Sequence, residues 1–137
     1  MEQPAARIMV IEDDVDLMRL IIHILRSAGY QVVQTYGGAD ALRKVKMQKP
    51  DLVLTDLAMP GMSGVEVIAQ IKGDAETRHI PCVAVTAHMW DHIAQAASQS
   101  GCDSLVGKPF NSVRLLQEVT KYVPLPGKLP ARPSPDR

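Results

Sequence analysis

The sequence contains few cysteines, few aromatic residues and no excess of charge of either sign. Cys82 and Cys102 are the only two cysteines among 137 residues, and they do not form a CxxC motif. A disulfide framework or a zinc site is therefore not expected, and buried thiols in a reducing compartment explain the cysteines better. Fifteen Lys and Arg residues balance fifteen Asp and Glu residues. We therefore expect no direct nucleic-acid binding, which needs clustered and uncompensated basic side chains.

Long apolar runs are also missing. No stretch approaches the roughly 20 consecutive apolar residues that span a bilayer, and residues 1–7 lack the apolar segment of a signal peptide. At the same time, 46% of the residues are hydrophobic and 22% are charged, which is typical of a globular domain with one sizeable core. We expect one soluble, cytoplasmic domain that does not bind a membrane.

Short apolar runs alternate with amphipathic segments along most of the chain. The runs, which are typical of strands, cover residues 8–11, 31–34, 52–55, 82–85 and 105–106. The segments with helical spacing cover residues 17–28, 37–47, 65–71, 90–100 and 113–123. This alternation predicts an α/β fold with five strand–helix pairs in a doubly wound parallel sheet, in which the polar-flanked strand 31–34 lies near an edge.

The composition changes at residue 124. Half of the ten prolines lie in residues 124–137, where apolar residues show almost no periodicity. Such a segment cannot bury enough surface to offset the entropy of ordering it. We therefore expect a folded domain over residues 6–123 and a flexible, proline-rich tail or linker over residues 124–137.

Polar and charged side chains stand at the carboxyl ends of four of the predicted strands. In chain order they are Glu12-Asp13-Asp14, Asp56, Thr86 and Lys108. Ligands of open parallel sheets bind beyond the carboxyl ends of the strands. We therefore expect several carboxylates, one hydroxyl and one ammonium group to converge on one edge of the sheet.

Carboxylates this close together repel one another unless a cation lies among them. Oxygen ligands without a nearby His or Cys favour Mg²⁺. An Asp beside bound Mg²⁺ can attack phosphorus as a nucleophile. The metal and a Lys would then neutralise charge on the transferred phosphoryl group. The pattern therefore indicates aspartyl-phosphate chemistry.

Four separated motifs carry a family resemblance. They are Val10-Ile11-Glu12-Asp13-Asp14, Leu54-Thr55-Asp56 followed by Met59-Pro60-Gly61-Met62-Ser63-Gly64, Val85-Thr86-Ala87, and Lys108-Pro109-Phe110. In this order and spacing they resemble a receiver domain of two-component response regulators, of the chemotaxis-regulator type, over residues 6–123. The resemblance implies a flavodoxin-like five-stranded parallel sheet of order 2-1-3-4-5 with five helices. It also implies a phosphorylation-switched signalling module rather than an enzyme, one that catalyses only its own phosphorylation and dephosphorylation.

The resemblance further implies the residues that hold Mg²⁺. Asp56 would be the phosphoacceptor and a metal ligand. Asp13 would bind Mg²⁺ directly, and Glu12 would bind it through a metal-bound water. The backbone carbonyl of Ala58 would be the remaining protein ligand.

The phosphoryl group itself would contact Thr86, through a hydrogen bond, and Lys108, through its charge. By the same resemblance the donor is a phosphohistidine on a histidine kinase or a histidine phosphotransfer protein, and the output is an unknown downstream protein. The Lys108–Pro109 bond is expected to be cis. Leu105 stands where the family usually has Tyr or Phe, so we expect the response to run mainly through the loop after Thr86 and the following helix.

Two structural alternatives remain for these polar residues. The acids at 12–16 could cap the first helix, with Asp13 and Asp16 as a capping box. His88 and His92 lie four residues apart and could bind zinc on one helical face, although no third ligand is evident.

Functional alternatives also remain. The chain could be a receiver cut from a hybrid histidine kinase or a longer regulator. An alternative of another class is a Mg²⁺-dependent phosphohydrolase with an aspartyl nucleophile, because Asp14-Val15-Asp16 loosely matches a DxD motif. A flavin carrier of the same fold is disfavoured because acids in the first loop would repel a phosphate.

Overall fold

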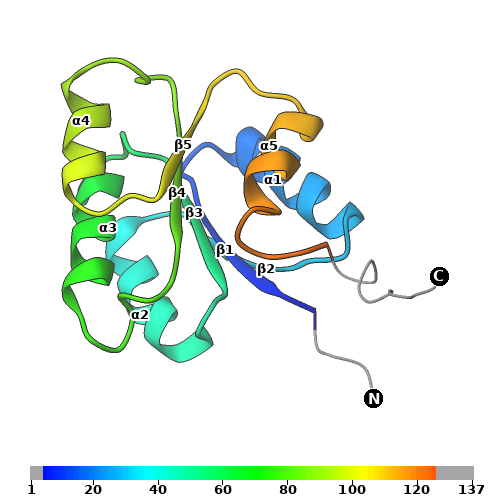
Figure 1. Cartoon of the computed structure of the whole chain (residues 1–137), viewed down its shortest axis with the longest axis horizontal. Helices are drawn as coiled ribbons and strands as arrows, with labels where there is room; N and C mark the ends of the chain where they lie inside the picture. The colour runs from blue at the N-terminus through cyan, green and yellow to red at the C-terminus, as the bar shows by residue number, and fades with distance from the viewer. Residues whose placement is uncertain (1–4, 126–137) are drawn as a thin grey trace.

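The computed structural model describes residues 5–125. Its elements in chain order are β1 (Arg7–Ile11), α1 (Val15–Ser27), β2 (Gln31–Thr35), α2 (Gly38–Gln48), β3 (Leu52–Thr55), α3 (Gly64–Gly73), β4 (Cys82–Thr86), α4 (His92–Gln99), β5 (Ser104–Gly107) and α5 (Ser112–Val119). The strands form one parallel sheet of order β2-β1-β3-β4-β5 (Figure 1). This order confirms the doubly wound fold and the edge position of the second strand. Over residues 5–125, no helix is both long enough and apolar enough to span a bilayer.

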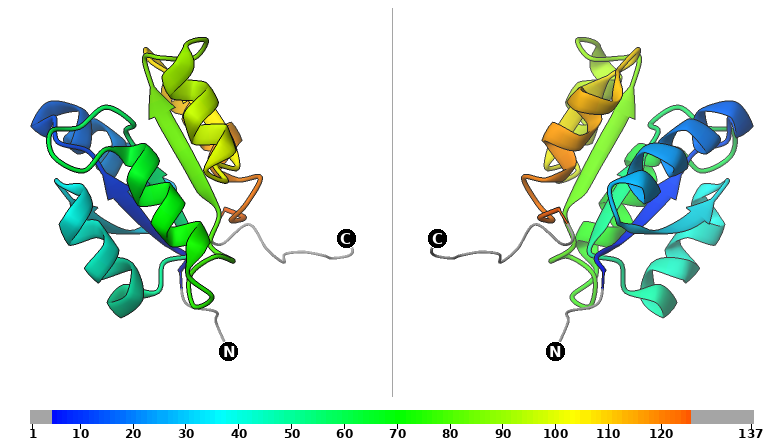
Figure 2. Two further views of the ribbon diagram at one scale, coloured as in Figure 1. Left: turned by 90° about the vertical axis from the view of Figure 1, so that its left-hand side faces the viewer. Right: turned by 90° about the vertical axis from the view of Figure 1, so that its right-hand side faces the viewer.

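Helices cover both faces of the sheet. Helices α1 and α5 lie on one face, and α2, α3 and α4 lie on the other (Figures 1 and 2). Side chains alternate between these faces along each strand. On β1, Ile8 and Val10 pack beneath α1 and α5, whereas Met9 and Ile11 pack beneath the other three helices. Burial on both faces explains why the strand is a continuous apolar run.

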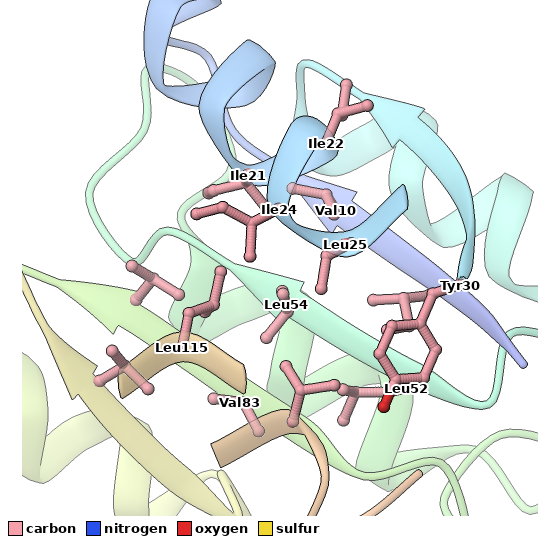
Figure 3. Packing of buried hydrophobic residues seen from close by; sticks show 14 of the residues in the cluster. Val10, Ile21, Ile22, Ile24, Leu25, Tyr30, Leu52, Leu54, Val83 and Leu115 are labelled. Atoms are coloured by element: carbon pink, nitrogen blue, oxygen red, sulfur yellow. The ribbon is translucent and has the colours of Figure 1, made fainter. Parts of the chain in front are cut away.

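The core beneath α1 and α5 is built from aliphatic side chains. Ile21 and Leu25 of α1 and Leu115 of α5 meet over Leu54 of β3 (Figure 3). All four side chains are at most 1% exposed. Burying a side chain of this size stabilises the fold by about 1.5–3 kcal/mol.

The core extends beyond the last helix. Helix α5 ends at Val119, whereas the apolar stripe predicts a helix up to residue 123. Val123 is nevertheless buried, and Leu125 packs against the core beneath α1 and α5. The Tyr30 hydroxyl, itself buried, donates a hydrogen bond of 2.6 Å to the Val123 carbonyl. Contacts with the core therefore continue past the sequence-based boundary at residue 123. Residues 126–137 of the expected tail lie outside the described residues.

The N-cap of α1 is Asp14. Its side chain accepts hydrogen bonds from the amides of Asp16 and Leu17 and so satisfies two donors of the first turn. The alternative that the acids at 12–16 cap the helix therefore holds for Asp14, whereas a capping box of Asp13 and Asp16 is wrong. Asp13 is left free of a capping role and stands beside Glu12 at the end of β1.

The N-cap of α4 is Asp91, and it starts this helix later than the sequence pattern predicts. Asp91 has an extended backbone (φ −106°, ψ −172°), and its side chain accepts from the amides of Ile93 and Ala94. Trp90 consequently lies in the loop before the helix, where it is 92% exposed.

The strand order reverses next to β1, and in open α/β sheets such a reversal marks the place at the carboxyl edge where ligands bind. The chain leaves β1 toward β2 on one side and returns to β3 on the other, so the loops after β1 and β3 diverge. Ile11 and Thr55 are paired in the parallel register. The residues that follow them therefore emerge side by side at this edge.

Gly64 at the start of α3 is required by close packing beneath the carboxyl edge of the sheet. A Cβ atom at Gly64 would overlap the backbone oxygen of Asp56. We expect Gly64→Ala to lower the free energy of unfolding by about 1–3 kcal/mol, as overpacking does. Gly73 at the other end of α3 has open space around it, so Gly73→Ala is the matched control and should be neutral or stabilising by up to ~1 kcal/mol. Urea denaturation compares the two variants, and equal losses would contradict this explanation.

Candidate functional site

Three carboxyl groups gather where β1 and β3 end. Carboxylate oxygens of Glu12, Asp13 and Asp56 lie within 4.8 Å of one another. Glu12 and Asp56 are 2% and 8% exposed, whereas Asp13 is exposed. The parallel register of β1 and β3 brings them together, because each acid follows the last residues of its strand. The structure thus assembles the acidic cluster that the sequence predicts.

Lys108 brings a positive charge to the same cluster from the end of β5. Its Nζ lies 3.4 Å from Glu12 Oε1 and 3.4 Å from Asp56 Oδ2. The Lys108 amide donates to the Thr86 carbonyl at 2.9 Å, which extends the β4–β5 pairing to this residue. The Lys108–Pro109 peptide bond is cis, as expected from the sequence. One ammonium group faces three carboxyl groups, so the site retains an excess of acidic groups.

The Glu12 side chain shows the electrostatic cost of this arrangement. Burial raises the pKa of Glu12 to about 7, and the charge of Asp56 and a hydrogen bond with Asp13 act in the same direction. The Asp14 amide, which donates to Glu12 Oε2 at 3.1 Å, and the Lys108 ammonium lower this pKa in part. The site therefore holds a carboxyl group that a nearby cation would stabilise in its charged form.

The donor set fits a hard divalent cation. All three clustered side chains offer carboxylate oxygens, and neither His nor Cys is among them. The Ala58 amide donates to Asp56 Oδ1 at 3.3 Å, so the Ala58 peptide lies beside the Asp56 carboxylate. Oxygen ligands of this kind, with room for water on the exposed Asp13 side, suit Mg²⁺.

Thr86 ends β4 at the same edge of the sheet. It is fully buried, and its Oγ1 accepts a hydrogen bond of 2.9 Å from the His88 amide. A hydroxyl that accepts one hydrogen bond still has its proton to donate. The bond to His88 leaves the Thr86 proton available to an acceptor group at this edge.

The zinc alternative receives no support. Among the described residues, Glu12, Asp13 and Asp56 are the only three acids, histidines or cysteines placed closely enough to share an ion. His88 lies before α4 rather than on it, and its Nδ1 is 2.7 Å from Asp91 Oδ2. This contact and the capping role of Asp91 were not predicted from the sequence. The available signal was an Asp near the start of the predicted helical segment 90–100, since Asp is a preferred N-cap residue.

Leu105 occupies β5 opposite Ala84 of β4. Its side chain is half-buried and packs against the core beneath α2, α3 and α4. Near the end of β5, a Cβ at Gly107 would lie 3.0 Å from Cγ of Met89. The Met89 side chain therefore covers Gly107, which lies two residues after Leu105 on β5. Position 105 itself carries no aromatic ring.

The two cysteines are free thiols, as expected. Burial raises the pKa of Cys82 to about 12 and also raises the pKa of Cys102. Thiols that stay protonated are poor nucleophiles and poor metal ligands. Neither cysteine therefore contributes to the chemistry at the acidic edge.

Comparisons with known proteins agree with this geometry. The family described as response regulator receiver domain matches residues 8–120. The polar-differentiation response regulator DivK of Brucella anthropi is 34% identical over 116 residues, which cover 85% of this chain and 94% of DivK. Among solved structures, chemotaxis protein CheY4 of Vibrio cholerae is similar with a TM-score of 0.83 and 24% identity, over 88% of this chain and 100% of that one.

A second solved structure is similar in both fold and sequence. The receiver domain of the sensor histidine kinase PA1611 from Pseudomonas aeruginosa has a TM-score of 0.82 and 26% identity, over 87% of this chain and 98% of that one. That structure has a magnesium ion coordinated in its active-site cleft. The family match covers nearly all of the described residues. The chain belongs to the receiver domains of two-component response regulators, a family of signalling proteins.

Proposed function

We propose that Asp56 accepts a phosphoryl group from a phosphohistidine donor and that the chain switches its state on this modification. The position of Asp56 supports the proposal most directly. It follows a buried central strand, stands among two further carboxyl groups, and has the Lys108 ammonium 3.4 Å from its Oδ2. This chemistry is assigned to the folded domain, residues 6–123.

The proposed transfer forms one bond and breaks one. An Asp56 carboxylate oxygen attacks the phosphorus, the P–N bond of the phosphohistidine breaks, and the donor imidazole leaves with the electron pair. Lys108 offsets the charge of the phosphoryl oxygens, and the Thr86 hydroxyl donates its proton to one of them in a hydrogen bond.

Four residues would hold Mg²⁺ in this proposal. They are Asp13 and Asp56 through their carboxylates, Ala58 through its carbonyl oxygen, and Glu12 through a water. When bound, the ion neutralises charge on the transferred phosphoryl group and supplies no redox chemistry. The magnesium in the related PA1611 receiver supports the choice of metal.

The proposed partners are a histidine kinase or a histidine phosphotransfer protein and one downstream protein. Receivers occur as separate regulators, such as DivK, and within sensor kinases, such as PA1611. A cytoplasmic location agrees with the two free thiols. The phosphohydrolase alternative is disfavoured, because Asp14 of its DxD motif caps α1. The Asp14 side chain accepts hydrogen bonds from the Asp16 and Leu17 amides.

Phosphorylation of Asp56 is tested with a small acyl phosphate and Mg²⁺. Intact mass should show one added phosphoryl group on the wild-type chain and none on Asp56→Asn, and chelation of Mg²⁺ should abolish labelling. Asp51→Asn is the matched control, because Asp51 is an exposed carboxylate before β3 that contacts the Arg7 amide. It should be labelled like the wild type. Labelling of Asp56→Asn, or steady hydrolysis of a generic phosphoester by the wild type, would contradict the proposal.

Asp56→Asn should also change stability, because it removes one of the crowded charges. In metal-free buffer we expect the free energy of unfolding to rise by about 1–2 kcal/mol, the scale of one close pair of like charges at partial burial. Mg²⁺ should stabilise the wild type progressively with concentration, as a ligand of the native state does, and should stabilise Asp56→Asn much less. Thermal denaturation with and without Mg²⁺ measures both effects. Equal stabilisation of the two chains would show that Asp56 is not a metal ligand.

A further inference from the structure

We propose that His88 and Asp91 are positioning residues, which orient the Thr86 hydroxyl toward the phosphoryl group and carry its movement to α4. The inference rests on the proposed phosphorylation of Asp56. In this inference, two residues of the β4–α4 loop couple the phosphorylation of Asp56 to the position of α4. The Leu105 side chain has no polar group that could do so.

The first link joins the reactive edge to the loop. The His88 amide donates to Thr86 Oγ1 at 2.9 Å, and Thr86 is fully buried. This bond occupies an acceptor site of the hydroxyl and leaves its proton free. When a phosphoryl group is present on Asp56, the proton is donated to a charged oxygen, which makes a stronger hydrogen bond than a neutral acceptor. The Thr86 side chain then moves, and the His88 amide must follow it or lose its acceptor.

The second link joins His88 to Asp91. Nδ1 of His88 lies 2.7 Å from Oδ2 of Asp91. An ionised carboxylate can only accept, so Nδ1 carries the proton of this bond. Partial burial raises the pKa of Asp91, but hydrogen bonds from His88, Ile93 and Ala94 outweigh it and hold this pKa below its usual value. The Asp91 carboxylate therefore serves as the common acceptor of the imidazole and of the two helix amides.

The third link joins Asp91 to the helix. Its other oxygen, Oδ1, accepts from the Ile93 amide at 3.0 Å and the Ala94 amide at 3.4 Å. Helix α4 has only two buried side chains, Ala94 and Ala97. Because these are small, little packing holds α4 in place, and its N-cap has a large influence on its position.

The packing on β5 favours this route over one through residue 105. Leu105 has no polar group that could exchange between a buried and an exposed environment. The space over Gly107, beside Thr86 in the strand register, is covered by Met89, a flexible thioether side chain. Met89 belongs to the same loop as His88. A shift of Thr86 can therefore move the whole loop without displacing a rigid side chain of β5.

Two single variants and their combination test the linkage in the full chain. Asp91→Ser keeps a side-chain oxygen that can cap the Ile93 and Ala94 amides, but its single hydroxyl is too short to reach Nδ1 of His88 as well. His88→Ala removes the same bond from the other side. Beryllium fluoride with Mg²⁺ serves as the phosphoryl mimic, and amide shifts of Ala94 and Ala97 and the fluorescence of Trp90, the only tryptophan, report the response.

We expect each variant to lose more than half of the mimic-induced shifts at Ala94 and Ala97 and to label Asp56 several-fold more slowly. The double variant should be no worse than either single variant, because residues of one linkage are not additive. A role confined to folding would instead lower the thermal midpoint, leave the shifts of the folded protein intact and give additive effects.

Two controls separate this linkage from general damage. Asn111→Ala removes the N-cap of α5, which accepts from the Arg114 amide, and should keep the α4 response. Leu105→Ala should keep it as well. Full α4 shifts in both Asp91→Ser and His88→Ala, or their loss in Leu105→Ala alone, would overturn the inference. Failure of the wild type to label at Asp56 would overturn the proposed function itself.

Discussion

The carboxyl groups of Glu12, Asp13 and Asp56 are held within 4.8 Å of one another, and the rest of the site depends on this crowding. Two of them are almost completely buried, so water screens their repulsion poorly. The Lys108 ammonium offsets part of the repulsion through two contacts of 3.4 Å. The remaining acidic excess is the electrostatic basis of the proposed Mg²⁺ binding, and a bound cation would let an anionic phosphoryl group approach an anionic acceptor.

The scaffold tolerates this local repulsion because it is stabilised elsewhere. Both faces of the sheet are covered by helices, and large aliphatic side chains such as Ile8 of β1, Leu54 of β3 and Leu25 of α1 are at most 1% exposed. Each such side chain contributes about 1.5–3 kcal/mol, which exceeds the cost of one unfavourable charge pair at partial burial. Tight packing also fixes the site, since the Asp56 backbone lies directly against Gly64 of α3. The covered faces of the sheet thus stabilise the domain, whereas the crowded charges lie at the carboxyl edge of the same sheet.

Much of the fold could be predicted from the sequence, because in a doubly wound domain burial and periodicity coincide. The apolar runs at 8–11, 52–55 and 82–85 match β1, β3 and β4 closely, since a strand covered on both faces must be apolar throughout. Helix ends were predicted less well. Trp90 falls outside α4 and Asp13 does not cap α1, because the cap depends on which carboxylate adopts an extended backbone and reaches the first-turn amides.

The sequence by itself determined which chemical groups stand at the carboxyl edge, because residues that follow parallel strands must emerge on the same side. It therefore predicted Glu12, Asp13, Asp56, Thr86 and Lys108 as one set. Only the tertiary structure decided how these groups are connected. The approach of Lys108 to two carboxylates and the chain of hydrogen bonds from Thr86 through His88 to Asp91 depend on distances of about 3 Å between side-chain atoms and, at His88, a backbone amide. Periodicity places a residue on an edge, but the packing of neighbouring strands and loops sets such distances.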